Sequence, residues 1–282
     1  FILAGDAAVR ITARYVRLDS IGLIFSSISY MGAAALRGSG NMRTPMLIFA
    51  VVAALNAAAS TLLVFGAGPI PALGIDGIVL GTVVARTTGG VLMTITLARG
   101  ISGLQLKPSE LCVVDHTVRR ILSVGIPAAL DGLAMWGGHF VFLTIIGRFG
   151  QTAFAAHTIG IRVEALTYLP AVAWAAAAAT VIGQSLGAGL RERARRAGHE
   201  ASLQCSLLGL VITLAFYFGA DPIYRAMHNN PAVIAIGVPA FQFLALFQIP
   251  LIIGIVYVGG LRGAGDTKVP MWITLFTTFA VR

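Results

Sequence analysis

The sequence predicts an all-α, polytopic membrane protein, a helical bundle of about eight spans. Of its 282 residues, 57% are hydrophobic and only 11% are charged, whereas soluble domains carry about 25% charged residues. The apolar residues gather in blocks of about 20 residues or more, the length of helix that crosses a bilayer. The basic residues lie mainly between these blocks. A soluble fold would leave the chain with too few charges to cover its surface.

The apolar blocks place the expected spans along the chain. Some of them exceed the length that a straight crossing needs, so we expect tilting or bending, with Pro170 and Pro250 as the candidate kinks. The sequence starts and stops inside apolar runs, so we interpret it as an internal fragment whose last span is truncated. The spans are expected at 9–36, 45–66, 75–98, 120–147, 153–187, 201–220, 232–261 and 269–282.

The basic residues predict the orientation in the membrane. They concentrate in alternate loops, at 37–44, 99–119, 188–199 and 262–268. Lys and Arg are retained on the cytoplasmic side of membrane proteins, so these loops are expected to be cytoplasmic in a multi-pass protein of the cell (inner) membrane. The net charge of +9 is then a charge asymmetry across the bilayer, and we expect no nucleic-acid partner.

An internal repeat is the strongest pattern in the chain. The segment Leu36–Met46 returns as Leu261–Met271 with six identical residues. Six spans separate the copies, so both face the same side of the membrane, and the halves should be parallel repeats about the membrane normal. Glycine allows a tight helix exit, and proline suits the first turn of the next helix. The turn residues are Arg37, Gly38, Gly40 and Pro45 in the first copy, and Arg262, Gly263, Gly265, Asp266 and Pro270 in the second.

A second motif runs from Val181 to Gly189 and contains Gly183, Gln184 and Gly187. Basic residues follow it, from Arg191 to Arg196, and Ala155-Ala156-His157 opens the same span. Together with the repeated turn, these segments resemble the multidrug and toxic compound extrusion (MATE) family of transporters.

The resemblance implies twelve spans in two six-helix lobes. Residues 1–105 would be the C-terminal part of the first lobe (about three spans), 106–120 a cytoplasmic linker, and 121–282 the second lobe (about five spans). It implies a secondary active efflux transporter, not an enzyme, which exports organic and often cationic compounds by alternating access. Protons or sodium ions would be the coupling ion, without other cofactors. The expected partners are the lipid bilayer and small organic substrates, and we expect a monomer.

Charged side chains inside spans are costly, so each calls for a reason. Asp131 and His139 share one face of the fourth span, and Arg162 and Glu164 lie in the fifth, with Glu164 about 16 Å from its outer end. One expected arrangement has Arg162 neutralised by Asp131 or packed near His139, with Glu164 facing a cavity. A partly dehydrated carboxylate can exchange protons near neutrality or, with carbonyls, hold sodium. A structural ion pair is the alternative for these residues.

Polar residues of the first lobe form a second candidate group. Asp19 and Arg86 lie at similar depth and could pair, and such a pair would be structural. The resemblance adds Asn56, which matches the first member of a polar pair in the family's fifth span, and Ser60, which stands where an acid can occur. The sequence departs from the sodium-coupled members, whose acid in the seventh span matches a position near Met135.

Two other functions are alternatives to efflux. A lipid-linked saccharide flippase of the same superfamily would need a wider and more basic cavity, which Arg86 and Arg162 would fit. A membrane-embedded enzyme would need clustered His, Asp, Glu or Cys residues. The sequence has no His-Glu-x-x-His motif, no serine nucleophile elbow and no spacing typical of a metal site, so no metal is expected.

Overall fold

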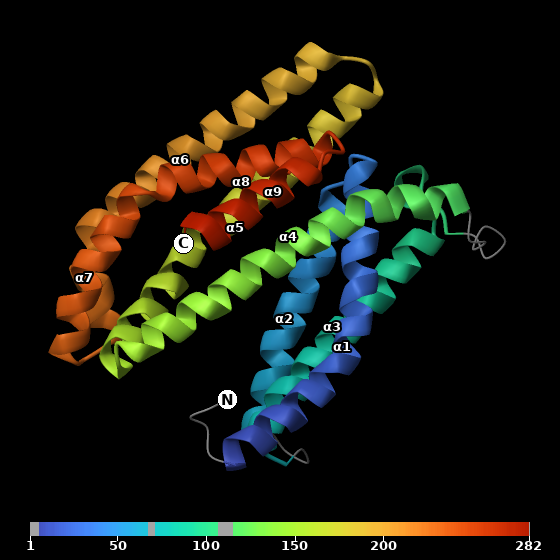
Figure 1. Ribbon diagram of the computed structural model, residues 1–282. Helices are drawn as coiled ribbons and strands as arrows, with labels where there is room; N and C mark the ends of the chain where they lie inside the picture. Colours follow the sequence, from blue (N-terminus) through green and yellow to red (C-terminus); the bar gives the residue numbers. More distant parts are fainter. Residues whose placement is uncertain (1–5, 67–70, 107–114, 282) are drawn as a thin grey trace. The chain divides into compact units, whose positions relative to one another are not determined.

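The computed structural model describes residues 6–66, 71–106 and 115–281, and all regular elements in these ranges are helices (Figure 1). This confirms the predicted all-α class. The helices are α1 (Asp6–Gly38), α2 (Arg43–Phe65), α3 (Ile75–Ala98), the short η1 (Ile101–Gly103), α4 (Asp115–Arg148), α5 (Gln151–Gly187), α6 (Arg191–Met227), α7 (Pro231–Leu246), α8 (Gln248–Gly263), α9 (Lys268–Phe276) and the π-helical turn η3 (Thr277–Val281).

The helices follow the expected spans with two differences. Six of the described helices are long and apolar enough to cross a membrane, and α7 with α8 makes a seventh candidate that is bent by 51°. The expected eighth span is represented by α9, only nine residues long, and by the π turn that follows it. The sixth span is longer than expected, because the polar stretch that begins at Arg191 is already helical in α6.

The break between α7 and α8 falls at Phe247. Pro250 lies three residues further on and has no N–H to bond the carbonyl of Leu246, four residues before it. The predicted kink is therefore present, just upstream of the proline. Pro170, the other candidate, lies inside α5 without interrupting the helix.

The chain divides into two compact units, Phe1–Cys112 and Val113–Arg282. In the first unit α3 packs along both α1 and α2. Glycines allow this approach: a Cβ on Gly81 would lie 2.6 Å from the Ser60 backbone nitrogen, and one on Gly90 3.0 Å from the Phe25 carbonyl oxygen. Residues 115–120, which we expected in the linker, already form the start of α4.

In the second unit α5 is the central helix. It packs against α6, α7 and α8, while α9 packs against α4. Small residues bring α5 and α8 together, because a Cβ on Gly259 would lie 2.8 Å from the Ala175 carbonyl oxygen and one on Gly263 2.4 Å from the Ala179 carbonyl oxygen. Such contacts are typical of helix association in membranes.

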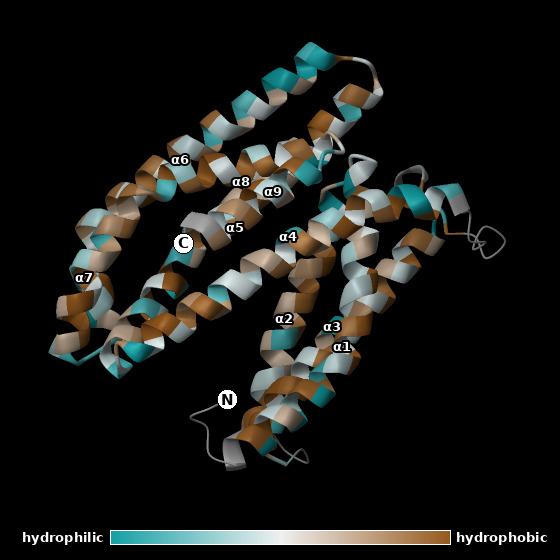
Figure 2. Cartoon of the chain, viewed as in Figure 1, coloured by the Kyte–Doolittle hydropathy of each residue, from teal (hydrophilic) through white to brown (hydrophobic). Residues whose placement is uncertain are grey.

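The outward faces of the helices are apolar. Figure 2 shows brown, hydrophobic residues along the helices and teal residues at the beginning of α6. Large side chains such as Ile24, Phe149 and Phe218 are 64%, 75% and 76% exposed. Lipid can solvate such surfaces and water cannot, so these helices belong to a multi-pass membrane protein.

The two copies of the repeated turn have the same backbone geometry. The Gly40 N–H donates to the Arg37 carbonyl and the Asn41 N–H to the Leu36 carbonyl, both at 2.9 Å; in the second copy Gly265 bonds Arg262 at 3.0 Å and Asp266 bonds Leu261 at 2.9 Å. This is the Schellman helix ending, which needs a left-handed residue. Gly40 and Gly265 supply it with φ of 90° and 87°.

The glycines before these turns differ from expectation, whereas the prolines after them match it. Gly38, one of the glycines expected to make the tight helix exit, is the last residue of α1 and has no positive φ. Its counterpart Gly263 serves close packing instead. The prolines are placed as predicted, since Pro45 and Pro270 are both buried in the first turn of the following helix.

The α5–α8 contact leads to the first prediction. Gly263→Ala should lower the melting temperature of the complete protein by about 5 °C or more, because the added methyl collides with the α5 backbone. Gly254→Ala on the same helix is the matched control, because a Cβ there meets nothing within 4 Å. Thermal unfolding followed by fluorescence size-exclusion chromatography measures both. Equal melting temperatures for the two variants would contradict the packing role of Gly263.

Candidate functional site

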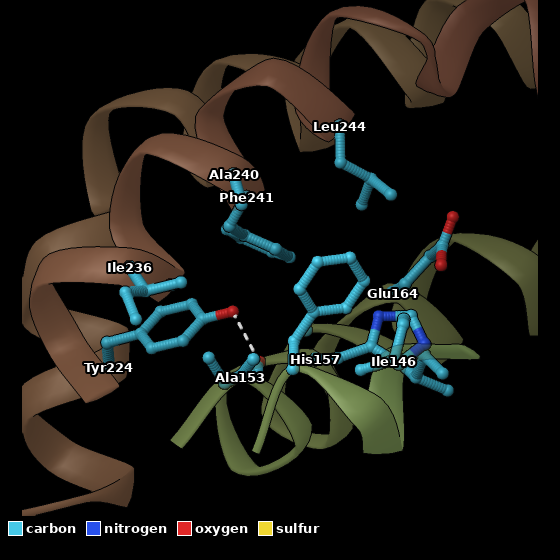
Figure 3. A pocket seen from close by; sticks show the side chains of 14 residues that line it. Ile146, Ala153, His157, Glu164, Tyr224, Ile236, Ala240, Phe241 and Leu244 are labelled. Carbon is cyan, nitrogen blue, oxygen red and sulfur yellow. Dashed lines mark hydrogen bonds between the residues drawn. The ribbon is translucent and has the colours of Figure 1, made fainter. Parts of the chain in front are cut away.

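A cavity of about 240 Å³ lies within the second unit, between the end of α4, the first half of α5, the end of α6 and α7. Figure 3 shows His157 and Glu164 projecting from α5 on the same side of the cavity as Ile146, with Phe241 and Leu244 reaching in from α7. Apart from His157, Glu164 and Tyr224, the residues that line it are apolar, and Glu164 is the carboxylate that the lining presents.

Glu164 is partly buried, and its partner is Gln248 at the start of α8. The Gln248 Nε2 group donates to Glu164 Oε1 at 3.3 Å and to the Leu244 carbonyl at 3.3 Å. Because both neighbours are acceptors, the amide must point its nitrogen toward them. Gln248 is 1% exposed, and its Oε1 atom has no hydrogen-bond partner in the part of the chain that the structure describes. The break between α7 and α8 thus places a buried amide against the carboxylate.

One end of the cavity is closed by Tyr224. Its hydroxyl donates to the Ala156 carbonyl at 2.9 Å, drawn as a dashed line in Figure 3. Its ring lies against Gly237, where any Cβ would come within 2.0 Å of Cε1. On the other side of the cavity, the His157 ring stacks edge-on with Phe142 of α4, with centroids 5.3 Å apart. Tyr224 thus links α6 to α5 and α7, and His157 links α5 to α4.

The structure corrects the expected partner of Asp131. The carboxylate does not pair with Arg162; its Oδ2 atom accepts from Arg262 at the end of α8. Asp131 is 5% exposed, and its Oδ1 atom has no hydrogen-bond partner among residues 6–66, 71–106 and 115–281. Arg262 was expected in a cytoplasmic loop, but a guanidinium side chain is long enough to turn back to a buried acid. A Thr267 hydroxyl, donating to the Val124 carbonyl at 3.1 Å, adds a second link between α4 and this turn.

The remaining candidates of this unit stand apart from the cavity. Arg162 is exposed, and no ion pair involves it within the described residues. His139 is partly exposed and contacts Trp136 on its own helix, with centroids 6.0 Å apart. Neither residue lines the cavity that contains Glu164. The structure therefore separates Asp131, His139 and Arg162 from Glu164, whereas their spans alone suggested one cluster.

In the first unit the expected pair of Asp19 and Arg86 is formed, with Nη1 2.7 Å from Oδ1. Asn56 Oδ1 accepts from the Ser60 hydroxyl at 2.9 Å and from the Thr82 hydroxyl at 3.4 Å. Arg86, Asn56 and Thr82 line a small cavity of about 150 Å³. Thr82 was missed in the sequence because a threonine inside a span carries no distinguishing pattern.

The motif that ends α5 is explained by packing and by its turn. A Cβ on Gly183 would lie 3.0 Å from the Gly263 carbonyl oxygen, whereas one on Gly187 would meet nothing within 4 Å. The left-handed residue is Gly189, with φ of 76°. Gln184 lines a small cavity beside this turn. No group of three or more potential metal ligands occurs among the described residues.

The buried pair leads to the second prediction. Asp131→Asn should lower the free energy of unfolding of the complete protein by about 1–3 kcal/mol. Arg262 then faces the neutral amide of the new asparagine and has lost its counterion. Arg262→Gln should act similarly, and the double variant should cost less than the two single losses together. Asp221→Asn is the control, since the Asp221–Arg225 pair is 50% and 66% exposed and should contribute little. Additive losses, measured as melting temperatures, would exclude the pairing.

Known proteins resemble this chain along most of its length. It is 28% identical to the probable multidrug resistance protein NorM of Thermotoga maritima over 268 residues. This aligned stretch makes up 95% of this chain and 58% of that protein. It is 27% identical to the FAD transporter of Shewanella oneidensis over 241 residues, which make up 82% of this chain and 51% of that protein. The chain therefore spans between half and two thirds of the length of these relatives.

The same fold occurs in a solved transporter structure. A MOP superfamily transporter from Pyrococcus furiosus, 21% identical, matches with a TM-score of 0.90 over 98% of this chain and 61% of that one. The MatE family model matches residues 127–282, more than half of the sequence. Together with the six or seven candidate spans among the described helices and the repeated glycine turn, this match shows that the chain belongs to the MATE family of membrane transporters.

Proposed function

We propose that the complete protein is a secondary active efflux transporter, which exports organic and often cationic compounds in exchange for protons or sodium ions, and that Glu164 with Gln248 forms its coupling site. The observation that carries the proposal is a partly buried carboxylate on the wall of a cavity, hydrogen-bonded to a buried amide at a helix break. The relatives named as multidrug resistance proteins support the export of drug-like compounds.

Protonation of Glu164 would change the hydrogen bonds around the break. The ionised carboxylate only accepts hydrogen bonds, whereas a protonated carboxyl can also donate one, and the Gln248 Oε1 atom is an acceptor without a partner in the described residues. If the carboxyl donated to that oxygen, the amide would reverse, and its nitrogen would give up the bond to the Leu244 carbonyl in the last turn of α7. Proton binding would thereby bias the bend between α7 and α8, which gives a two-state element for alternating access.

A sodium ion would use the same atoms differently. Alkali and other hard cations prefer oxygen ligands, and Glu164 with the unpartnered Gln248 Oε1 atom offers them. Thr167, one turn further along α5, has a buried hydroxyl oxygen that also lacks a hydrogen-bond partner in the described part of the chain. Either ion would compete with the Gln248 nitrogen for the carboxylate.

Anionic substrates are the second candidate class, as expected for the flippase alternative. Arg162 is exposed without an ion pair in the described residues, and one relative is named as an FAD transporter. Arg86 no longer supports this alternative, because Asp19 neutralises it. We favour cationic and neutral compounds, since one of the two arginines that would make a basic cavity is paired.

The third prediction tests coupling. In the complete protein Glu164→Gln should reduce ion-driven ethidium efflux from energised vesicles by about tenfold or more, because the side chain keeps its shape and hydrogen bonding but no longer gains or loses charge. The amount of membrane-inserted protein should stay the same. Glu192→Gln is the control, since Glu192 is a 59% exposed acid at the start of α6. Full efflux by the Glu164 variant would assign coupling to another acid.

The fourth prediction tests orientation. A single cysteine at position 193, in the basic segment after α5, should react with a membrane-impermeant maleimide in inverted vesicles and stay unlabelled in intact cells. A cysteine at position 229, between α6 and α7, should show the opposite pattern, because α6 separates the two positions. Labelling of position 193 in intact cells would reverse the proposed topology.

A further inference from the structure

His157 is a titratable side chain that lines the same cavity as Glu164. Among the described residues that line this cavity, the titratable ones are His157 and Glu164 of α5 and Tyr224 of α6, whereas α4 and α7 contribute only apolar side chains. Arg148 at the end of α4 and Arg225 near the end of α6 are exposed and lie outside the lining. Imidazole is the side chain whose charge changes between about pH 5 and 8, so His157 can gain and lose a proton near neutrality.

The imidazole and the carboxylate lie on one face of α5. His157 and Glu164 are seven residues apart, which is about two helical turns and about 10 Å along the axis. Figure 3 shows both side chains on the same side of the cavity. His157 is the nearer of the two to the beginning of α5, and the predicted topology places that end of the helix at the outer face. A proton that enters from outside would therefore meet His157 before Glu164.

A glycine keeps room between these two groups. Gly160 lies three residues after His157 and four before Glu164, so it shares their face of the helix, and it lines the cavity. A Cβ at this position would lie 3.2 Å from the Tyr224 hydroxyl oxygen and 3.7 Å from the Phe241 ring. Any larger side chain would therefore narrow the cavity between the imidazole and the carboxylate.

The cavity is large enough for waters that would join the two groups. Its volume is about 240 Å³, whereas one water occupies about 30 Å³ in the liquid, and water enters an apolar cavity only where polar atoms hold it. His157 and Glu164 supply such atoms. The Tyr224 hydroxyl donates its hydrogen to the Ala156 carbonyl, so its oxygen can still accept from a water. Waters about 2.8 Å apart would span the distance in three or four steps.

We propose that His157 is the proton donor of Glu164, and that it passes protons from the outer side along waters in the cavity to the carboxylate. The inference rests on the coupling role proposed for Glu164 and takes the proton as the coupling ion. A ring nitrogen of neutral His157 binds a proton from the outer water. The imidazolium then releases a proton through the waters to a Glu164 carboxylate oxygen and becomes neutral again. The contact with Phe142 positions the ring and adds no charge that would hold the proton on it.

His157→Ala in the complete protein, reconstituted in liposomes, tests the proton donor. With acid outside, the initial rate of ethidium efflux should fall by about tenfold or more, because a positioned proton donor typically contributes about 10²–10⁴-fold. Exchange of internal for external ethidium at equal pH should be unchanged, since it moves no proton. His139→Ala is the matched control, because His139 is a histidine of α4 that does not line the cavity, and it should leave both rates unchanged.

Imidazole in solution separates proton transfer from packing. It is small enough for the space that the alanine variant leaves, so it should restore the efflux of His157→Ala. It should not restore the efflux of Glu164→Gln, which lacks the proton acceptor. Rates are compared at the same pH gradient, which trapped pyranine reports.

Four outcomes would overturn this proposal and leave the coupling role of Glu164 standing, as long as Glu164→Gln fails in the same liposomes. They are undiminished efflux by His157→Ala, an equal loss of efflux and exchange, a loss that imidazole does not restore, and efflux that follows a sodium gradient but not the pH gradient. An equal loss of both rates would make His157 a packing residue. Full efflux by Glu164→Gln would instead overturn the coupling site and the proton donor together.

Discussion

The close contact between α5 and α8 is the constraint on which the second unit depends. Gly259 and Gly263 let α8 lie against the backbone of α5 at Ala175 and Ala179, and the two ends of α8 are placed as a result. At its start, Gln248 meets Glu164 of α5. At its end, Arg262 reaches Asp131 of α4. Hydrophobic exclusion from water gives little force between helices in lipid, so backbone proximity must provide the attraction.

Charge inside these helices is handled in two ways. Asp19 with Arg86, and Asp131 with Arg262, are neutralised by a partner on another helix, so each ion pair also links two helices. Glu164 receives a neutral amide donor and has no ion pair within the described residues, which is why it is the residue proposed for coupling. A carboxylate that is fully paired would hold its charge too firmly to couple transport, since its partner would have to leave at each cycle.

The break between α7 and α8 connects the coupling proposal with the fold. Pro250 removes the backbone hydrogen bond to the Leu246 carbonyl, and the Gln248 side chain donates to the Leu244 carbonyl in the last turn of α7. The same amide serves the carboxylate of Glu164. One side chain therefore belongs to both the helix break and the candidate ion site, and a change at either is felt at the other. Interrupted helices that expose backbone groups at ion sites are a recurring feature of transporters.

The sequence by itself determined the helical class, most span positions, the family and the repeated turn, because these depend on local hydropathy and on glycine and proline geometry. It also singled out Glu164 and the pair of Asp19 with Arg86. Only the tertiary structure decided that Asp131 pairs with Arg262 and that Gln248 and Tyr224 belong to the site. The position of a residue along its span gives only its depth in the membrane. Which side chains pair depends on which helices are neighbours and on how far a long side chain reaches. A buried glutamine or tyrosine has no periodic pattern, so its role emerges only when distant helices pack together.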